Sequence, residues 1–356
     1  MSQTNAARKT VVTPRLIAND NGYAYHKLAW KDERNKICTG KIPTRIQVGG
    51  DHGTTTGQSI GAYEVDGQVF QCLSSLQNPL ELRNADYPVS VANRVLFVHA
   101  LAKNGLLGLP VSGAVTLPFS DYFNPDGSIN EVLRAKTEAN FTEAKVTVCN
   151  SEVQPHILNI RACAEGMSAW FDWAMTDDGD MSPAYEEWVD AGGEMLVVDI
   201  GGSTTDLVTV GLEEEQLLIN HAKSGTEKVG VIDVLNKLQE LVRARLAKEG
   251  EGGASGHAGR LSEQLINNIL QKGECMYAGK KWDFRMEVDR ACSGVAERIT
   301  NYIKSRVGNP GLYHMILVVG GGSIVFRSQI EALYTNAVFG DEFSNARGAL
   351  KFLSGQ

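Results

Sequence analysis

Residues 195–210 read Met-Leu-Val-Val-Asp-Ile-Gly-Gly-Ser-Thr-Thr-Asp-Leu-Val-Thr-Val, two apolar runs joined by a short turn of small residues. Gly201 and Gly202 lack a Cβ, so backbone amides in the turn can close on an anion that a larger side chain would hold away. Hydroxyl donors are added by Ser203, Thr204 and Thr205. The segment therefore predicts a β-hairpin built around a phosphate, and an ordinary hairpin turn is the alternative.

Asp199 enters this turn at the end of the first apolar run. A carboxylate and a phosphate both carry negative charge at neutral pH, so Asp199 is not expected to bind phosphate directly. Its predicted role is to hold the water ligands of a hard divalent cation. The turn thus predicts a nucleotide bound together with Mg²⁺.

The N-terminal segment 15–30 repeats the arrangement, with an apolar run, Asp20, a turn, and an alternating run that leads to Lys27. The turn consists of Asn21, Gly22, Tyr23 and Ala24. Asp20 is predicted to face the same cation as Asp199, also through water. Lys27 can reach back over the turn as a point charge for β- and γ-phosphate oxygens.

A third glycine turn follows the apolar run 315–319 and precedes a predicted helix. Its residues are Gly320, Gly321, Gly322 and Ser323. They suit a base and ribose lying against the backbone, with the helix N-terminus directed at the α-phosphate. One such turn is weak evidence, because strand-to-helix turns use glycine routinely. Three of them, far apart in one chain, indicate a nucleotide site.

In this order the three turns resemble the phosphate 1, phosphate 2 and adenosine motifs of the actin, Hsp70 and sugar-kinase superfamily. The chain is most similar to the ParM/StbA plasmid-segregation actins. The likeness is carried by Asp20-Asn21-Gly22, by Lys-Leu-Ala-Trp at 27–30 and by Thr-Leu-Pro-Phe-Ser-Asp-Tyr-Phe at 116–123. It runs in register from about residue 16 to about residue 348.

The resemblance implies an α/β architecture, the actin-like ATPase fold, in which two RNase H-like domains enclose an interdomain nucleotide cleft. Domain I is expected over residues 1–175, with a smaller subdomain within about 31–90. Domain II is expected over 176–340, with a smaller subdomain within about 225–300. Residues 341–356 are expected to form a helix that returns to domain I. At 356 residues, the chain has the length at which two domains are the usual arrangement.

The resemblance also points to Glu165 as the carboxylate that positions the attacking water. ParM-type actins carry Pro-Glu-Gly or Pro-Glu-Ser at a strand end before a helix, and this chain has Ala-Glu-Gly at 164–166. Taken without the family, Glu165 is interpreted as a first-turn helix glutamate. Glu152 and Gln154 compete for the catalytic position, but Glu165 is preferred because its spacing from Ala-Asn-Phe at 139–141 matches and the following helix begins there. The chain departs from the family pattern at Ala164, where the family often has proline, and at Tyr23, where the family has a small hydroxyl residue that contacts the γ-phosphate.

The function implied by the resemblance is ATP hydrolysis coupled to polymerisation of the protein with itself. A ParR-like adaptor bound to centromeric plasmid DNA would attach the filament to its cargo. The net charge of −8 argues against direct binding of DNA or of an anionic membrane through bulk electrostatics. A small-molecule kinase of the same superfamily is an alternative, although no aspartate in a convincing context offers a base for a substrate hydroxyl. A noncatalytic nucleotide-binding module is another alternative.

The six cysteines show no CxxC and no metal-ligand spacing, which favours buried, reduced thiols and a cytoplasmic location. No segment approaches the roughly 20 apolar residues of a membrane span.

Local patterns predict several further elements. Ser90 is the expected N-cap of a helix over 91–104, and residues 128–131 form a capping box for a second helix. Residues 176–193 are acidic and contain glycine and proline, so they predict an exposed connection. Further helices are predicted over 229–246, 261–270 and 287–307. Two glycine-rich stretches, 49–61 and 248–259, predict a loop and an insertion.

Overall fold

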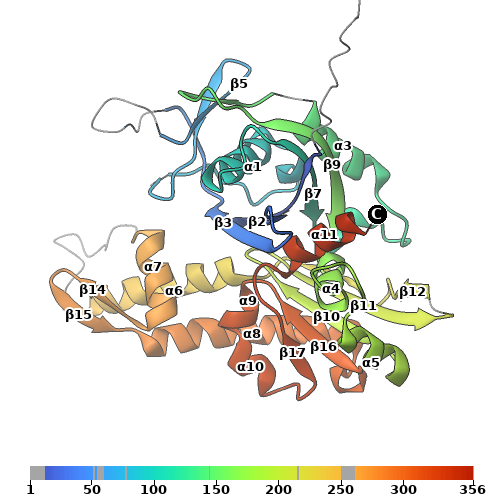
Figure 1. Ribbon diagram of the computed structural model, residues 1–356. Helices are drawn as coiled ribbons and strands as arrows, with labels where there is room; N and C mark the ends of the chain where they lie inside the picture. Colours follow the sequence, from blue (N-terminus) through green and yellow to red (C-terminus); the bar gives the residue numbers. More distant parts are fainter. Residues whose placement is uncertain are drawn as a thin grey trace, which may run out of the picture.

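The structure is a computed structural model that describes residues 13–50, 53, 60–76, 78–143, 145–214, 216–249 and 261–355. Most of the two glycine-rich stretches, 49–61 and 248–259, lies outside the described residues. Two β-sheets lie one above the other in Figure 1, and the C-terminal helix lies between them. In the described part of the chain, no helix is long and apolar enough to cross a membrane.

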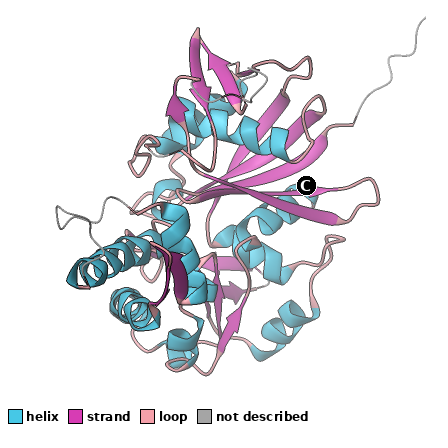
Figure 2. Ribbon diagram, turned by 90° about the vertical axis from the view of Figure 1, so that its left-hand side faces the viewer, coloured by secondary structure: helices cyan, strands magenta, loops and turns pink. Residues whose placement is uncertain are grey.

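The first sheet has five strands, in the order β3(Ile37–Pro43), β2(Tyr25–Lys31), β1(Arg15–Asn21), β7(Pro110–Leu117) and β9(His156–Ala164). Strands β1, β2 and β3 are antiparallel neighbours, whereas β1, β7 and β9 run parallel. The strands cross the middle of the molecule in Figure 2, with helices above and below them. Because parallel strands end at the same edge of a sheet, the residues that follow β1, β7 and β9 meet there.

The second sheet repeats this strand order with β12(Gln216–Ile219), β11(Thr205–Glu213), β10(Met195–Ile200), β16(Met315–Val319) and β17(Ala337–Phe339), and β13(Gly225–Glu227) pairs with β11. The predicted hairpin is confirmed, since β10 and β11 are antiparallel and Ile200 lies opposite Thr205. Strands β10 and β16 are parallel, with Asp199 opposite Val319. This pairing brings the second and third glycine turns to one edge of the sheet.

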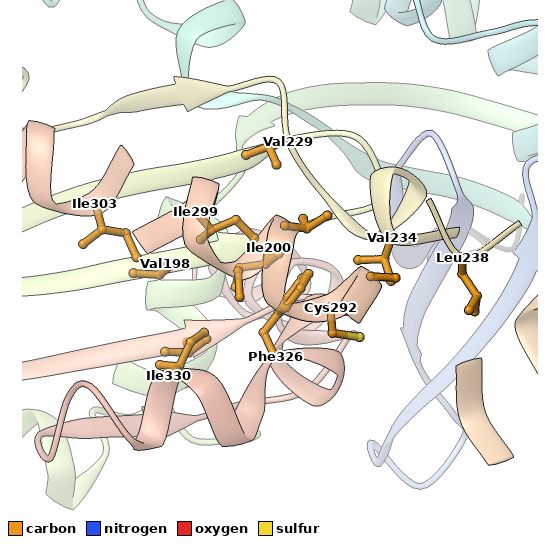
Figure 3. Close-up of a cluster of buried hydrophobic side chains, with 14 of the residues drawn as sticks. Val198, Ile200, Val229, Val234, Leu238, Cys292, Ile299, Ile303, Phe326 and Ile330 are labelled. Atoms are coloured by element: carbon orange, nitrogen blue, oxygen red, sulfur yellow. The ribbon is translucent and has the colours of Figure 1, made fainter. Parts of the chain in front are cut away.

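Three helices cover the outer part of the second half: α6(Val231–Lys248), α7(Glu263–Lys272) and α8(Arg285–Val307), with the hairpin β14(Glu274–Tyr277) and β15(Lys280–Asp283) between the last two. Each helix begins within two residues of the position that its sequence pattern predicts. Apolar side chains of α6 and α8 pack on the second sheet, as Figure 3 illustrates, whereas α7 packs on α6 and β14. The side chains labelled there are Val198, Ile200, Val229, Val234, Leu238, Cys292, Ile299, Ile303, Phe326 and Ile330.

The first half carries a small four-stranded sheet, in the order β4(Gln47–Val48), β6(Gln68–Gln71), β5(Ala62–Val65) and β8(Thr147–Val148), and the helices α1(Val91–Lys103) and α3(Glu131–Thr142). The predicted cap of α1 is confirmed, because the Ser90 side chain accepts a hydrogen bond from the Asn93 amide.

The predicted capping box at 128–131 is wrong. The Asn130 side chain, not that of Ser128, accepts the hydrogen bond from the Leu133 amide and begins α3. Ser128 instead donates its hydroxyl to Asp126 within the preceding turn. Its oxygen is therefore engaged locally, and asparagine is an equally good cap.

The prediction of an exposed connection over 176–193 is also wrong in its second half, which forms α5(Pro183–Ala191). Ser182 caps this helix by accepting from the Tyr185 amide, and Pro183 takes the first helical position. Trp188 is fully buried against Trp170 and Trp173. Six acidic residues over 176–193, three of them within α5, obscure the pattern of an amphipathic helix whose apolar face is aromatic.

Two helices link the halves of the molecule: α4(Met167–Ala174) follows β9, and α11(Ser344–Ser354) is the C-terminal helix. Ala346, Ala349 and Leu350 of α11 pack on the alanines of the first sheet. Arg347 and Lys351 pair with Asp172 of α4. The short helices are η1(Tyr87–Val89), α2(Phe119–Tyr122), η2(Pro310–Leu312), α9(Gly322–Val325) and α10(Arg327–Glu331). No feature of this arrangement fixes the predicted domain limits, which stay predictions.

Candidate functional site: an interdomain nucleotide cleft

A cleft of about 1410 Å³ opens between the two sheets. Most of the predicted site residues line it, namely Asp20, Asn21, Gly22, Tyr23, Ala24, Lys27, Glu165, Asp199, Gly201, Gly202, Ser203, Thr204 and Gly321. The first two turns touch across the cleft, because a Cβ at Gly202 would lie 2.6 Å from the Cβ of Ala24. Residues about 180 positions apart in the chain therefore form one site.

The first turn holds a buried ion pair. Asp20 and Lys27 are opposite each other in the β1–β2 pairing, and the Lys27 Nζ lies 2.7 Å from the Asp20 Oδ2. Burial opposes the lysine charge, but contact with Asp20 outweighs it and raises the pKa of Lys27. The neighbouring Asn21 side chain accepts a hydrogen bond from the Thr116 amide at 2.9 Å, which fixes the turn against β7. Lys27 thus stays a cation at the cleft wall.

The second turn presents Asp199 as a buried carboxylate. Burial and the charge of Asp20 raise the pKa of Asp199 to about 6, whereas a hydrogen bond from Asn345 and the charge of Lys27 oppose the rise. The Asp20 and Asp199 carboxylates are therefore close enough to repel each other, as two groups facing one cation would.

Glu165 lies where β9 gives way to α4, at the edge that β1 and β7 also reach. The Thr116 hydroxyl lies 3.1 Å from the Glu165 Oε1 and 3.2 Å from the Asp20 Oδ1, so one side chain links the two carboxylates. Burial, together with the charges of Asp20, Asp206 and Asp199, holds the pKa of Glu165 well above its usual range. The Glu165 carboxyl group therefore holds a proton more readily than an exposed glutamate does.

Asp206 is a fourth acid beside the site, and no motif in the sequence assigns it a role. It lies opposite Asp199 in the β10–β11 pairing, and its Oδ1 accepts from the Phe119 amide at 2.8 Å and from the Thr226 hydroxyl. It therefore ties the second domain to the segment after β7. The signal in the sequence is the aspartate at each end of the glycine turn, which exceeds what a plain hairpin needs.

The third turn divides into lining and packed residues. Gly320 has φ +81°, and a Cβ there would overlap the Asp199 Oδ1, so glycine is required beside that carboxylate. Gly322 is packed on Ile200, and the Ser323 hydroxyl donates to the Gly340 carbonyl oxygen at 3.2 Å. Gly321 alone of the four predicted residues lines the cleft. Gly320, Gly322 and Ser323 instead pack against neighbouring residues and fix the conformation of the turn.

The Tyr23 side chain packs against residues of its own domain. Its hydroxyl donates to the Asn84 carbonyl oxygen at 3.2 Å, and its ring centroid lies 5.1 Å from that of Tyr87. Burial, with smaller effects of Asp121 and Glu165, raises the pKa of Tyr23 to about 12, so the phenol stays neutral. In this geometry the backbone of the turn, not the Tyr23 hydroxyl, faces the second domain.

The donor set fits a hydrated Mg²⁺. Asp20, Asp199 and Asp206 are buried and Glu165 is half-buried, and Lys27 is the buried lysine paired with Asp20, so acids outnumber the lysine in this cluster. Among the described residues, no group of three or more acids, histidines or cysteines could hold a metal ion directly. Mg²⁺ commonly keeps several waters and binds through one or two carboxylates and substrate phosphates. Asp20 and Asp199 can supply such contacts through water.

Two arginines of the first domain cross the cleft. Arg83 donates to the Ser203 carbonyl oxygen at 3.0 Å and lies 3.3 Å from the Asp233 carboxylate at the start of α6. Arg45 pairs with Glu263 at the start of α7. Because Ser203 belongs to the second turn, Arg83 connects the first domain directly to the segment that is predicted to bind phosphate.

The Asp206→Asn variant is expected to be more stable than the wild type at about pH 8 and to lose most of that advantage by about pH 4. Burial and the charge of Asp199 raise the pKa of Asp206 from 3.8 to about 7. An acid with a raised pKa binds more protons folded than unfolded, so the wild type loses stability as pH rises through this range. Asparagine keeps an acceptor for Phe119 and Thr226, and this rise in the pKa corresponds to a gain of roughly 4 kcal/mol at pH 8.

This change is measurable by urea unfolding of the nucleotide-free protein at several pH values. Asp178→Asn, in an exposed turn, is the matched control and should leave the pH profile unchanged. An Asp206→Asn profile parallel to that of the wild type would contradict the expectation.

Two family models match long segments of the chain. A family model of the N-terminal region of the plasmid segregation protein ParM (StbA) matches residues 15–175, and a model of the C-terminal region of MreB-like archaeal actin homologues matches residues 197–332. No curated protein sequence matches the chain.

Solved structures with the same fold include a non-polymerisable quadruple mutant of pCBH ParM, with a TM-score of 0.74, 16% identity, and coverage of 97% of this chain and 100% of that one. Ta0583, an archaeal actin homologue, in complex with ADP has a TM-score of 0.70, 18% identity, and coverage of 96% and 99%. A 15-stranded ParM filament from Clostridium botulinum has a TM-score of 0.69, 17% identity, and coverage of 97% and 100%.

The predicted fold class is therefore confirmed, with two domains of the same strand order around an interdomain cleft. The chain thus has the actin-like fold, its first domain matches the ParM (StbA) family, and its second domain matches the archaeal MreB-like actin homologues.

Proposed function

We propose that this protein is an ATPase that polymerises into filaments with Mg²⁺-ATP and segregates plasmid DNA through a ParR-like, DNA-bound adaptor. The observation that carries the proposal is the meeting of Asp20, Asp199 and Glu165 in one cleft lined by two glycine turns. The match to the ParM family model and the ParM filament among the similar structures support self-association.

In this proposal the amides of both turns bind the β- and γ-phosphates, and Lys27 adds a positive charge beside them. Mg²⁺, bound through waters to Asp20 and Asp199, would neutralise phosphate charge. Glu165 accepts a hydrogen bond from the attacking water and orients it toward the γ-phosphorus. Positioning and electrostatics of this kind are the main contributions that a protein makes to phosphoryl transfer.

Hydrolysis would act on the filament through the cleft. Arg83 holds the first domain to the turn that contains Ser203, so a change in that turn reaches the interdomain contact directly. Loss of the γ-phosphate removes contacts that bridge the domains, and the cleft can open. Subunits joined head to tail in an open filament would then separate more readily.

A cytoplasmic location accompanies this function. All six cysteines are free thiols, as a reducing compartment favours, and burial raises the pKa of Cys72 and Cys163 above the ordinary range. Their thiols are therefore neutral at physiological pH and belong to the core.

The proposal is tested by pelleting the purified protein with ATP, ADP or a nonhydrolysable ATP analogue while phosphate release is measured. We expect polymer in the pellet with the two triphosphates, little with ADP, and phosphate release only with ATP. Nucleotide binding without hydrolysis or pelleting would favour a noncatalytic module. Transfer of phosphate to a small molecule without pelleting would favour a kinase.

A further inference from the structure

Asn345 of α11 connects two parts of the site that are far apart in sequence. It is only 4% exposed, and its side-chain Nδ2 donates to the Asp199 Oδ2 at 2.5 Å. Its Oδ1 accepts from the Gly166 amide at 3.1 Å. Gly166 directly follows Glu165, so one amide group joins the backbone of one proposed functional residue to the carboxylate of another.

The chemistry of these partners requires an amide. A carboxylate can only accept here and a backbone N–H can only donate, so the orientation of the Asn345 side chain is fixed by its two contacts. Leucine of similar size would satisfy neither partner, and aspartate would satisfy only the Gly166 amide. An unsatisfied buried carboxylate is costly, so Asp199 would be driven to another position.

Holding α11 in place does not account for this side chain. Asn345 is the second residue of the helix and does not cap it. Arg347 and Lys351 of the same helix already fix α11 to α4, through Asp172. The Asn345 amide points away from its own backbone, to groups 146 and 179 positions away in sequence.

We propose that Asn345 is a positioning residue that fixes the Asp199 carboxylate relative to the backbone beside Glu165. Asp199 is the proposed ligand of the waters around Mg²⁺ and Glu165 the proposed ligand of the attacking water, so Asn345 would keep these two groups correctly placed for the same nucleotide. The inference rests on the proposed function. Groups that orient a metal-binding side chain without touching the metal typically change metal affinity or activity by about 10- to 100-fold when removed. Asn345 acts through Asp199 and Gly166 and is not itself a catalytic residue.

The test uses the full chain and three variants. Asn345→Leu removes both hydrogen bonds, and Asn345→Asp keeps the one from Gly166. Arg347→Met weakens the attachment of α11 without touching Asn345. For each protein, kcat and KM for ATP are measured, ADP affinity is determined by calorimetry with and without Mg²⁺, and thermal unfolding is followed.

We expect both Asn345 variants to lose about 10-fold or more in kcat with KM changed less than about threefold. The factor by which Mg²⁺ strengthens ADP binding should fall several-fold in both. Arg347→Met should lower the unfolding temperature and keep the wild-type Mg²⁺ effect. Folded Asn345 variants with wild-type kcat and Mg²⁺ effect would overturn the inference, and so would losses that merely follow unfolding temperature across all three variants. Absence of ADP binding or hydrolysis in the wild type would instead refute the proposed function.

Discussion

Replacing Glu165 by glutamine is expected to slow phosphate release from ATP by roughly 10²- to 10³-fold, because a positioned acid–base group contributes about that much. Glutamine keeps the size of the side chain and can still accept the hydrogen bond from Thr116. It cannot take up a proton, whereas burial among acids holds the pKa of Glu165 well above its usual range. ATP binding should change little, since the phosphates are bound by the two turns.

The measurement is phosphate release at saturating Mg²⁺-ATP, with ATP affinity determined separately. Glu152→Gln is the matched control, because Glu152 competes with Glu165 in the sequence but is exposed in the loop after β8. That variant should behave as the wild type. Under the proposed function, Glu165→Gln should also give polymer that persists longer after ATP is added. Equal rates for Glu165→Gln and the wild type would remove Glu165 from the mechanism.

Replacing Gly348 by alanine is expected to lower the free energy of unfolding by about 3 kcal/mol or more, among the largest effects of a single methyl group. Helices α4 and α11 cross at this glycine. A Cβ there would overlap the Ser168 carbonyl oxygen and lie 2.7 Å from the Asp172 amide nitrogen. Both are backbone atoms of α4, so no change of rotamer relieves the overlap and the helices must separate.

Gly294→Ala is the control for this prediction. Gly294 lies in the exposed face of α8, and a Cβ there would meet nothing within 4 Å. Alanine in an exposed helix is favoured over glycine by about 0.5 to 1 kcal/mol, so this variant should be slightly stabilised. Urea unfolding measures both. A Gly348→Ala protein as stable as Gly294→Ala would show that the two helices can part without cost.

The parts of the site that the sequence predicts are those encoded in contiguous segments. An apolar strand, an aspartate and a glycine turn lie within about ten residues, so the turns at Asp20 and Asp199 are visible locally. The antiparallel pairing of β10 with β11 follows from the length of the turn. The junction at Glu165 is visible because a strand pattern ends one residue before it.

The parts that the sequence does not predict are contacts made by tertiary structure. Asn345 and Arg83 reach their partners across 146 and 120 positions, and nothing in their neighbouring residues marks them. A different reason explains why the sequence pattern does not indicate the helix α5. Its charged residues conceal an aromatic face whose burial depends on Trp170 of another helix.

The repeated strand order of the two sheets has a consequence for the polarity of the cleft. Asp20 and Asp199 take equivalent places, each near the end of the first of two paired strands, and their cross-strand partners are Lys27 and Asp206. Both domains thus place an aspartate at the same point of the sheet, but the residue paired with it is a lysine in the first domain and an aspartate in the second. The equivalent cross-strand position therefore carries a cation in the first domain and an acid in the second. This difference between Lys27 and Asp206 makes the two walls of the cleft electrostatically unequal, although the two sheets have the same strand order.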